Sequence, residues 1–291
     1  MATLRDIKRR IKSVKSTQQI TRAMKMVSAS KLRRAHQDIL AARPYADKIN
    51  ELVSSLLSTI KDGAHPLLSK KRAEEKEEGK KIELMLFASD RGLCGSFNAS
   101  LLRKTERFVR EHPEFNINLH IISKRAVEYF KYRAAPVIKA EPMGSARPSY
   151  GRAEGIAKDV MEGYLKDRSD EVYIIYSEFQ SALTQRAVVK KLLPVTPAEG
   201  FSAGAMEEAV FEPSKEELLS SLLPKCVEVE IFRALLESCA SEHGARMTAM
   251  DAASRNASEM IDALTLQYNR ARQATITKEL MEIIGGAEAL K

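Results

Sequence analysis

Apolar and small residues recur at heptad spacing in the first 60 residues, which hold no glycine and a single proline, Pro44. From Ala35 onward the steps alternate between four and three, which predicts one seam of a coiled coil. Proline removes a backbone donor, so Pro44 is a candidate kink. The expected seam positions are Leu4, Ile7, Ile11, Val14, Ile20, Met24, Val27, Ala35, Ile39, Ala42, Ala46, Ile49, Val53, Leu56 and Ile60.

The other end of the chain has the same kind of pattern. No proline follows Pro224, and steps of three and four begin at Met247. Several seam residues are small, which permits close approach of a partner helix. About 60 helical residues would extend about 90 Å, which is longer than a small domain is wide. The expected seam positions are Met247, Met250, Ser254, Ala257, Ile261, Leu264, Tyr268 and Ala271.

The middle of the chain alternates short apolar runs with helical patterns. This alternation predicts an α/β domain with a mostly parallel sheet, a Rossmann-like arrangement. The expected strands are 82–90, 117–123, 135–139, 172–177 and 186–194, and the expected helices are 99–111, 124–132 and 150–167. The charged segment 67–81 is expected to be a solvated loop or a frayed helix end.

These patterns divide the chain into four segments. We expect an N-terminal coiled-coil helix (1–62), a charged linker (63–81), a central α/β domain (82–209) and a C-terminal coiled-coil helix (210–291). Because the first helix runs toward the central domain and the last runs away from it, their seams would pair antiparallel.

Positive charge is concentrated at the N-terminus. The chain carries +8 overall, but residues 1–50 hold 13 Lys and Arg against three Asp and Glu, a net charge of +10. Such a helix favours an acidic partner. Three interpretations stay open: an acidic protein partner, a nucleic acid partner, and a solvated helix face without a partner. Nucleic-acid binding proteins often stack bases on aromatic side chains, and Tyr45 is the single Phe, Tyr or Trp residue in this segment.

The glycine-containing turn SDRGLCGSFN (89–98) is the best candidate for chemistry. A turn of this kind after a strand can bind phosphate through backbone amides. It matches neither GxxxxGK[ST] nor GxGxxG. Two interpretations therefore stay open: an anion site, which would allow an independent nucleotide hydrolase, or a structural turn with Ser96 or Asn98 as the helix cap.

No other catalytic or cofactor-binding pattern stands out. Three scattered cysteines suit a reducing compartment, and no His lies at metal-ligand spacing from Cys or carboxylates. We expect no catalytic residue, no metal and no cofactor. His120 is expected to be packed in a strand. The N-terminus lacks the apolar core of a secretory signal, and no run reaches the ~20 apolar residues of a membrane span.

Three segments resemble the gamma subunits of F-type ATP synthases. They are LRDIKRRIKSVKSTQQITRAMKMVSASKLRRA (4–35), SDRGLCGSFN (89–98) and ARQATITKELMEIIGGAEAL (271–290). The resemblance implies a non-catalytic central-stalk rotor that transmits rotation of the membrane c-ring to the catalytic beta subunits. Its partners would be the alpha and beta subunits, epsilon and the c-ring, at the cytoplasmic side of a bacterial inner membrane. A basic coiled-coil protein that binds nucleic acid is the alternative.

The resemblance also implies where partners bind. Met24 matches a position that faces an acidic lever of the beta subunit. Phe211 and Glu212 match a region near the c-ring and epsilon. The remaining positions implied to contact beta are Arg246, Arg272, Gln273, Thr277 and Glu279. The final helix would then end as a polar collar, 272–279, followed by an apolar tip, 280–289.

Overall fold

The computed structural model describes residues 3–59, 65–68, 79–133, 136–144, 147–196 and 214–288. The chain forms two compact units. Unit 1 comprises Met1–Ser28 and Met247–Lys291, and unit 2 comprises Ala29–Arg246. Two long helices, α1 (Leu4–Thr59) and α6 (Lys215–Glu288), contribute to both units.

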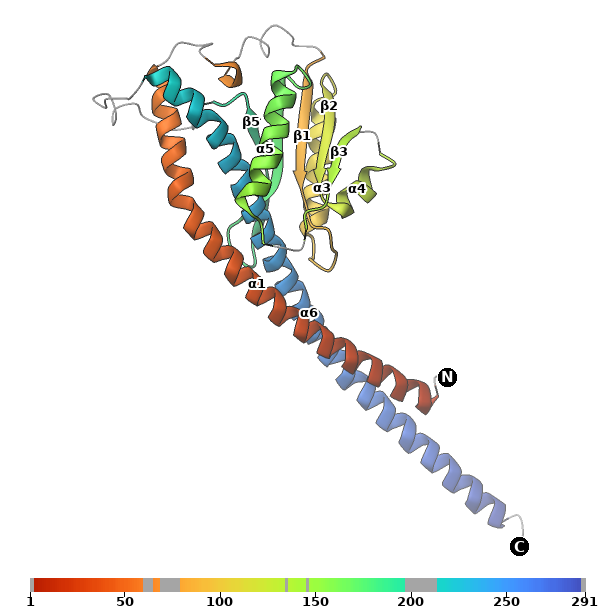
Figure 1. Ribbon diagram of the computed structural model, residues 1–291. Helices are drawn as coiled ribbons and strands as arrows, with labels where there is room; N and C mark the ends of the chain where they lie inside the picture. The colour runs from red at the N-terminus through yellow and green to blue at the C-terminus, as the bar shows by residue number, and fades with distance from the viewer. Residues whose placement is uncertain are drawn as a thin grey trace. The chain divides into compact units, whose positions relative to one another are not determined.

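Unit 2 contains a five-stranded sheet in the order β3-β2-β1-β4-β5 (Figure 1). The first four strands in this order are parallel, and β5 is antiparallel to β4. The predicted α/β domain with a mostly parallel sheet is therefore confirmed. The strands are β1 (Lys81–Phe87), β2 (Asn116–Ile122), β3 (Val137–Glu141), β4 (Glu171–Phe179) and β5 (Gln185–Leu193).

Each face of the sheet has its own apolar core, because β1 and β2 alternate buried side chains between the two faces. On one face, α3 (Phe97–Glu111) and α4 (Lys124–Phe130) cover Leu84, Leu86 and their neighbours. On the other face, α5 (Tyr150–Leu165) and parts of α1 and α6 cover Met85 and Phe87. The two helical layers are visible in Figure 1.

Within unit 2, the predicted seam of α1 is buried. Ala35, Ile39, Ala46 and Ile49 are at most 5% exposed, and Val53 and Leu56 at most 2%. Helix α1 continues through Pro44. The seam packs against α6 and the sheet rather than against one helix alone. Ile60, the last expected seam position, lies outside the described residues.

The charged segment after α1 is only partly described. Residues 66–68 form the short 3₁₀ helix η1 (Pro66–Leu68), and Leu67 is 2% exposed within the core. The expectation that solvated chain begins at residue 67 is therefore wrong for Leu67, because this apolar side chain fills the core beside α5. The four-segment division of the chain stays a prediction.

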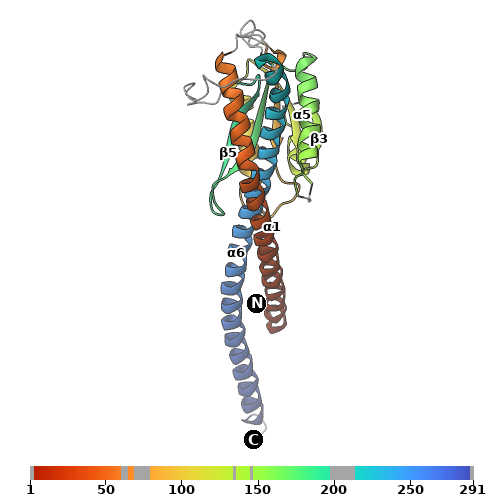
Figure 2. The ribbon, with the colours of Figure 1, turned by 60° about the vertical axis from the view of Figure 1, so that its left-hand side comes forward.

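Unit 1 consists of the N-terminal part of α1 and the C-terminal part of α6, which run antiparallel and side by side (Figure 2). On α6 the least exposed positions are those of the predicted seam, from Met247 to Ala271. The two helices are joined by an ion pair of 2.5 Å between Lys25 Nζ and Asp251 Oδ1.

The predicted seam of α1 is displaced by one residue at Ile20, Met24 and Val27 in unit 1, and Met24 is half-buried. Ile20 and Val27 are each 57% exposed, whereas Thr21 and Ser28 are buried at 8% and 3%. The heptad period continues unbroken from Val14. Position in this period, rather than the polarity of the residue, therefore decides which side chains are buried. The less exposed positions that it selects are Leu4, Ile7, Ile11, Val14, Gln18, Thr21, Lys25 and Ser28.

Candidate partner-contact sites

The C-terminal tip of α6 has no helix of the described residues beside it. The Lys25–Asp251 pair fixes the antiparallel register, and both helices rise equally per residue. Leu4 at the start of α1 is therefore level with about residue 272. Figures 1 and 2 show α6 continuing past the N-terminal end of α1. Every described side chain from Arg272 to 287 is accordingly exposed.

The tip presents polar residues first and apolar residues afterwards. Four of the predicted beta-contact residues are exposed here: Arg272, Gln273, Thr277 and Glu279. Beyond them, large apolar side chains are more than half exposed. These are Leu280 (53%), Met281 (62%), Ile283 (72%) and Ile284 (51%). A soluble helix rarely exposes so much apolar surface without a partner, so the tip is a candidate binding surface.

A second exposed surface lies on α1. Met24 is half-buried beside the seam residue Lys25, and three apolar neighbours point outward. They are Ile20 (57%), Met26 (69%) and Val27 (57%). Sequence reasoning missed Ile20 and Val27 as surface residues because it placed both in the seam. Strict continuation of the heptad from Val14 would have found them.

The same part of α1 carries a dense positive charge. Seven of its cations are exposed: Arg5, Lys8, Arg9, Arg10, Lys12, Lys15 and Arg22. Residues 3–28 contain a single acidic residue, Asp6. Hydrogen bonds with Thr3 are the chief cause that lowers the pKa of its carboxyl group. The apolar group around Met24 is thus flanked by a basic helix surface, which suits an acidic partner.

Arg246 is placed differently from the other predicted contact residues. It is 8% exposed and its guanidinium is used inside unit 2. Its Nη1 lies 2.6 Å from Glu242 Oε1, and Nη2 donates to the Gly92 carbonyl at 3.3 Å and to Ser89 Oγ at 3.5 Å. These bonds tie α6 to the turn that follows β1.

That turn, Ser89–Asn98, is held by its own side chains. Asn98 Oδ1 accepts from the Ser89 amide at 3.0 Å, and Asn98 Nδ2 donates to the Arg91 carbonyl at 3.2 Å. Helix α3 begins at Phe97, and Ser96 at the N-cap position makes no capping bond. The expectation that Ser96 or Asn98 caps this helix is therefore wrong, because Asn98 bonds the turn instead.

The anion that backbone amides bind at this turn is the carboxylate of its own residue Asp90. Its carboxylate accepts from the backbone amides of Lys124 (2.7 Å), Met143 (2.9 Å) and Gly144 (2.8 Å). Burial alone would raise the pKa of Asp90, but these three donors hold it below its usual value. The contacts are those of a structural turn that joins three loops.

The buried cysteines and histidines show no arrangement for chemistry. In the described ranges, no group of three or more His, Cys, Asp or Glu is placed to hold a metal. Burial raises the pKa of Cys226 and of Cys239 to about 12, so neither is an activated thiol. His120 is fully buried, and its Nδ1 lies 3.1 Å from Glu83 Oε1.

Phe211 and Glu212 lie outside the described residues, so their expected role near the c-ring and epsilon stays a prediction. We find no helix in the described part of the chain whose length and hydropathy would let it cross a bilayer.

Comparison with known proteins gives a consistent result. The family model described as "ATP synthase" matches residues 3–290. The ATP synthase gamma chains of Trichlorobacter lovleyi, Geobacter metallireducens and Geotalea daltonii are 49%, 50% and 51% identical, each over the full length of both chains.

Solved structures agree with the fold. A central-stalk chain of the Tetrahymena thermophila mitochondrial ATP synthase matches with a TM-score of 0.60 and 25% identity, covering 81% of this chain and 99% of that one. A chain of the Euglena gracilis mitochondrial ATP synthase matches with a TM-score of 0.65 and 19% identity, covering 99% and 94%. On the strength of its full-length relatives at about half identity, the chain belongs to the ATP synthase gamma chain family.

Proposed function

We propose that this chain is the central-stalk rotor subunit of a proton-translocating F-type ATP synthase. It transmits rotation of the membrane c-ring to the beta subunits, where ATP is made or hydrolysed, and it has no catalytic residue of its own. The observation that carries this proposal is the exposed tip of α6, because a polar collar and an apolar end without a helix partner suit a shaft that turns inside other subunits. The comparisons give no support to a nucleic-acid-binding role.

The proposed partners follow from the two exposed surfaces and the family. The alpha and beta subunits enclose unit 1, and the c-ring and epsilon bind unit 2. The chain is a peripheral component of a bacterial inner membrane, on its cytoplasmic side, and is held there by the complex. Arg272, Gln273, Thr277 and Glu279 contact beta at the tip, and Met24 contacts an acidic part of beta on α1.

We also propose Arg246 as a beta-contact residue. Its role is to position neighbouring parts of the chain, because its charge is already paired. Its guanidinium already bonds Glu242, Ser89 and Gly92. Its contribution is to hold the turn and α6 in place where beta meets them.

Co-purification tests the assignment as a whole. When this chain is tagged and isolated from its source membrane, alpha and beta subunits should accompany it in a complex that pumps protons on addition of ATP. Recovery of the intact chain without these subunits would refute the proposal.

The Met24 surface has a separate test. Met24→Lys should add a charge-assisted contact to the acidic beta surface and reduce the protons pumped per ATP hydrolysed. Arg125→Met, which alters an exposed pair on α4, serves as the control. Equal coupling in Met24→Lys and the wild type would count against Met24 as a contact residue.

A further inference from the structure

One turn of α6, residues 226–230, makes directional bonds to three other elements of unit 2. Cys226 Sγ donates to Asn50 Oδ1 on α1 at 3.4 Å. Glu230 Oε1 accepts from Asn50 Nδ2 at 2.9 Å, and Glu230 Oε2 accepts from Lys190 Nζ on β5 at 2.6 Å. Glu228 Oε2 accepts from the Tyr150 hydroxyl on α5 at 2.6 Å.

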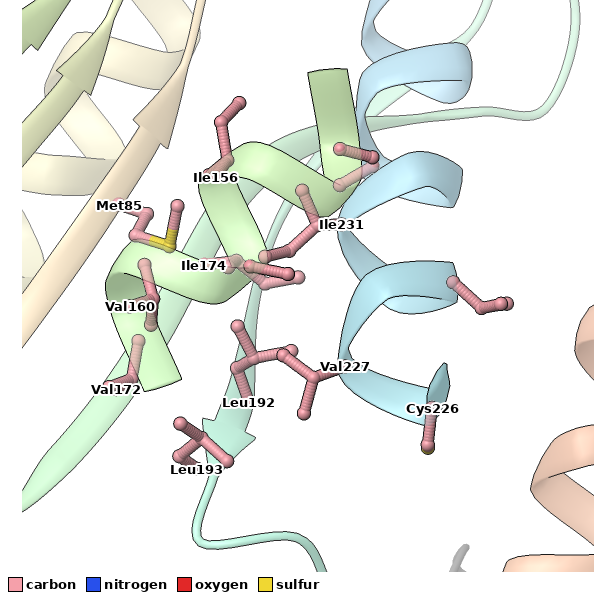
Figure 3. Packing of buried hydrophobic residues seen from close by; sticks show 14 of the residues in the cluster. Met85, Ile156, Val160, Val172, Ile174, Leu192, Leu193, Cys226, Val227 and Ile231 are labelled. Carbon is pink, nitrogen blue, oxygen red and sulfur yellow. The ribbon is translucent and has the colours of Figure 1, made fainter. Parts of the chain in front are cut away.

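These bonds lie on opposite sides of the helix axis. Successive residues of an α-helix are rotated by about 100°, so Cys226 and Glu230 lie on one side and Glu228 about 160–200° away. Val227 and Ile231, at most 1% exposed, pack between them against the sheet. Figure 3 shows Val227 directed toward Leu192 while Cys226 points away from the sheet residues. Rotation of α6 in either direction would therefore break bonds on both sides.

The charges at this turn are costly unless they are paired. Glu228 and Glu230 are each 6% exposed. Apolar residues of similar size would often stabilise such a position at least as well, whereas a buried carboxylate that loses its partner is strongly destabilising. Burial would raise the pKa of Glu230, but Lys190 and Asn50 keep it below its usual value, so the side chain stays ionised. Rotation of α6 away from Asn50 and Lys190 would leave the buried Glu230 carboxylate without these partners.

We propose that Cys226, Glu228 and Glu230 form an angular key that fixes α6 to α1, α5 and β5, and that torque applied to the sheet of unit 2 passes into α6 through this key. This inference rests on the proposed rotor function. Asn50, Tyr150 and Lys190 are its positioning residues. Because a single turn contacts all three elements, loosening it lets the sheet turn without turning the helix to the same extent.

The test uses the complete complex in sealed vesicles and measures protons pumped per ATP hydrolysed. Lys190→Met and Glu230→Ala each remove the bond to β5, and both should lower this ratio. The exchange variant Glu230→Lys with Lys190→Glu restores the pair in reverse. Asn50 can then turn its amide, so that its oxygen accepts from the new ammonium group and its NH₂ group faces Cys226 Sγ, a weak acceptor. The exchange should recover the ratio. Arg125→Met on the exposed α4 pair is the matched control and should leave the ratio at the wild-type value.

The outcomes separate the key from a purely structural role. A lower ratio in fully assembled single variants, with recovery in the exchange variant, supports the proposal. An unchanged ratio in assembled Glu230→Ala, or a loss of pumping that only follows the loss of assembled complex, overturns it. Failure of the rotor function itself would look different, because the wild-type chain would then be absent from the pumping complex.

Discussion

Helix α6 has two regions with opposite surroundings, although it is one uninterrupted helix. From Leu222 to Arg246 no residue is exposed, and the buried set includes Glu228, Glu230 and Glu237. From Arg272 to residue 287 every residue is exposed, and this set includes Ile283 and Ile284. The first region buries charge and the second exposes apolar side chains.

The difference shows that the polarity of a residue in α6 does not indicate whether it is buried or exposed within this chain. In unit 2 the chain supplies its own partners for the buried carboxylates, through Tyr150, Lys190 and Arg233. At the tip, the apolar side chains have no such partner in the described residues, and this exposure supports the proposed contact with other subunits. One region of α6 therefore fixes the helix in its own chain, and we propose that the other contacts the complex.

The largest expected effect is on stability, and it falls on the buried region of α6. Ile231→Ala empties a site that is 0% exposed and should lower the free energy of unfolding of the isolated chain by about 2–5 kcal/mol. Urea unfolding followed by circular dichroism measures this loss. A change as small as that of a surface variant would contradict the assignment of this region as core.

A second prediction concerns pH and the buried region. Burial lowers the pKa of His243 to about 4 from its usual 6.5, an effect that Glu242 opposes and Arg246 adds to. Between these values the unfolded chain binds a proton that the folded chain does not, so stability falls as pH decreases from 6.5 toward 4. The loss should approach ~1.4 kcal/mol per pH unit. His243→Gln should flatten this part of the profile, and an unaltered profile in that variant would contradict the prediction.

A third, smaller effect belongs to the two-helix part of unit 1. Lys25→Met removes the ion pair with Asp251 and should reduce helix content near room temperature only slightly. Because both side chains are partly exposed, salt should screen the interaction. Circular dichroism of the variant and wild type should therefore converge as ionic strength rises. A difference that grows with salt would point to lost packing instead.

The smallest effect on stability is expected at the tip. Ile283→Ala changes a side chain that is 72% exposed and should shift the unfolding free energy of the isolated chain by less than about 0.5 kcal/mol. The same substitution should reduce rotation-driven coupling in the complex more than its stability effect would suggest. Destabilisation of the isolated chain as strong as that of Ile231→Ala would show that Ile283 packs against a partner within the chain, and would contradict the exposed tip.

Much of the fold could be predicted from the sequence. Heptad spacing placed the α6 seam, because a single buried face leaves a clear period. Apolar runs placed the strands, because a parallel sheet covered on both faces needs nearly continuous apolar strands. The α1 seam failed at Ile20 and Val27, where the period selects Thr21 and Ser28 instead. Polar seam residues are invisible to a search for apolar ones.

The buried bonds of unit 2 could not be predicted. Glu230 meets Asn50 and Lys190, which are 180 and 40 residues away in sequence. A glutamate on a helix usually marks a solvent face, and nothing local signals that this one is buried. The exposed tip could be found from its sequence, because its order of polar and apolar residues is local.

Hydrogen exchange of backbone amides, compared between the isolated chain and the assembled complex, tests the contrast within α6 most directly. We predict that residues 226–241 exchange slowly in both states, because they are fixed within unit 2. Residues 272–287 should exchange rapidly in the isolated chain and slowly in the complex. Slow exchange of 272–287 in the isolated chain, or rapid exchange in the complex, would contradict the account.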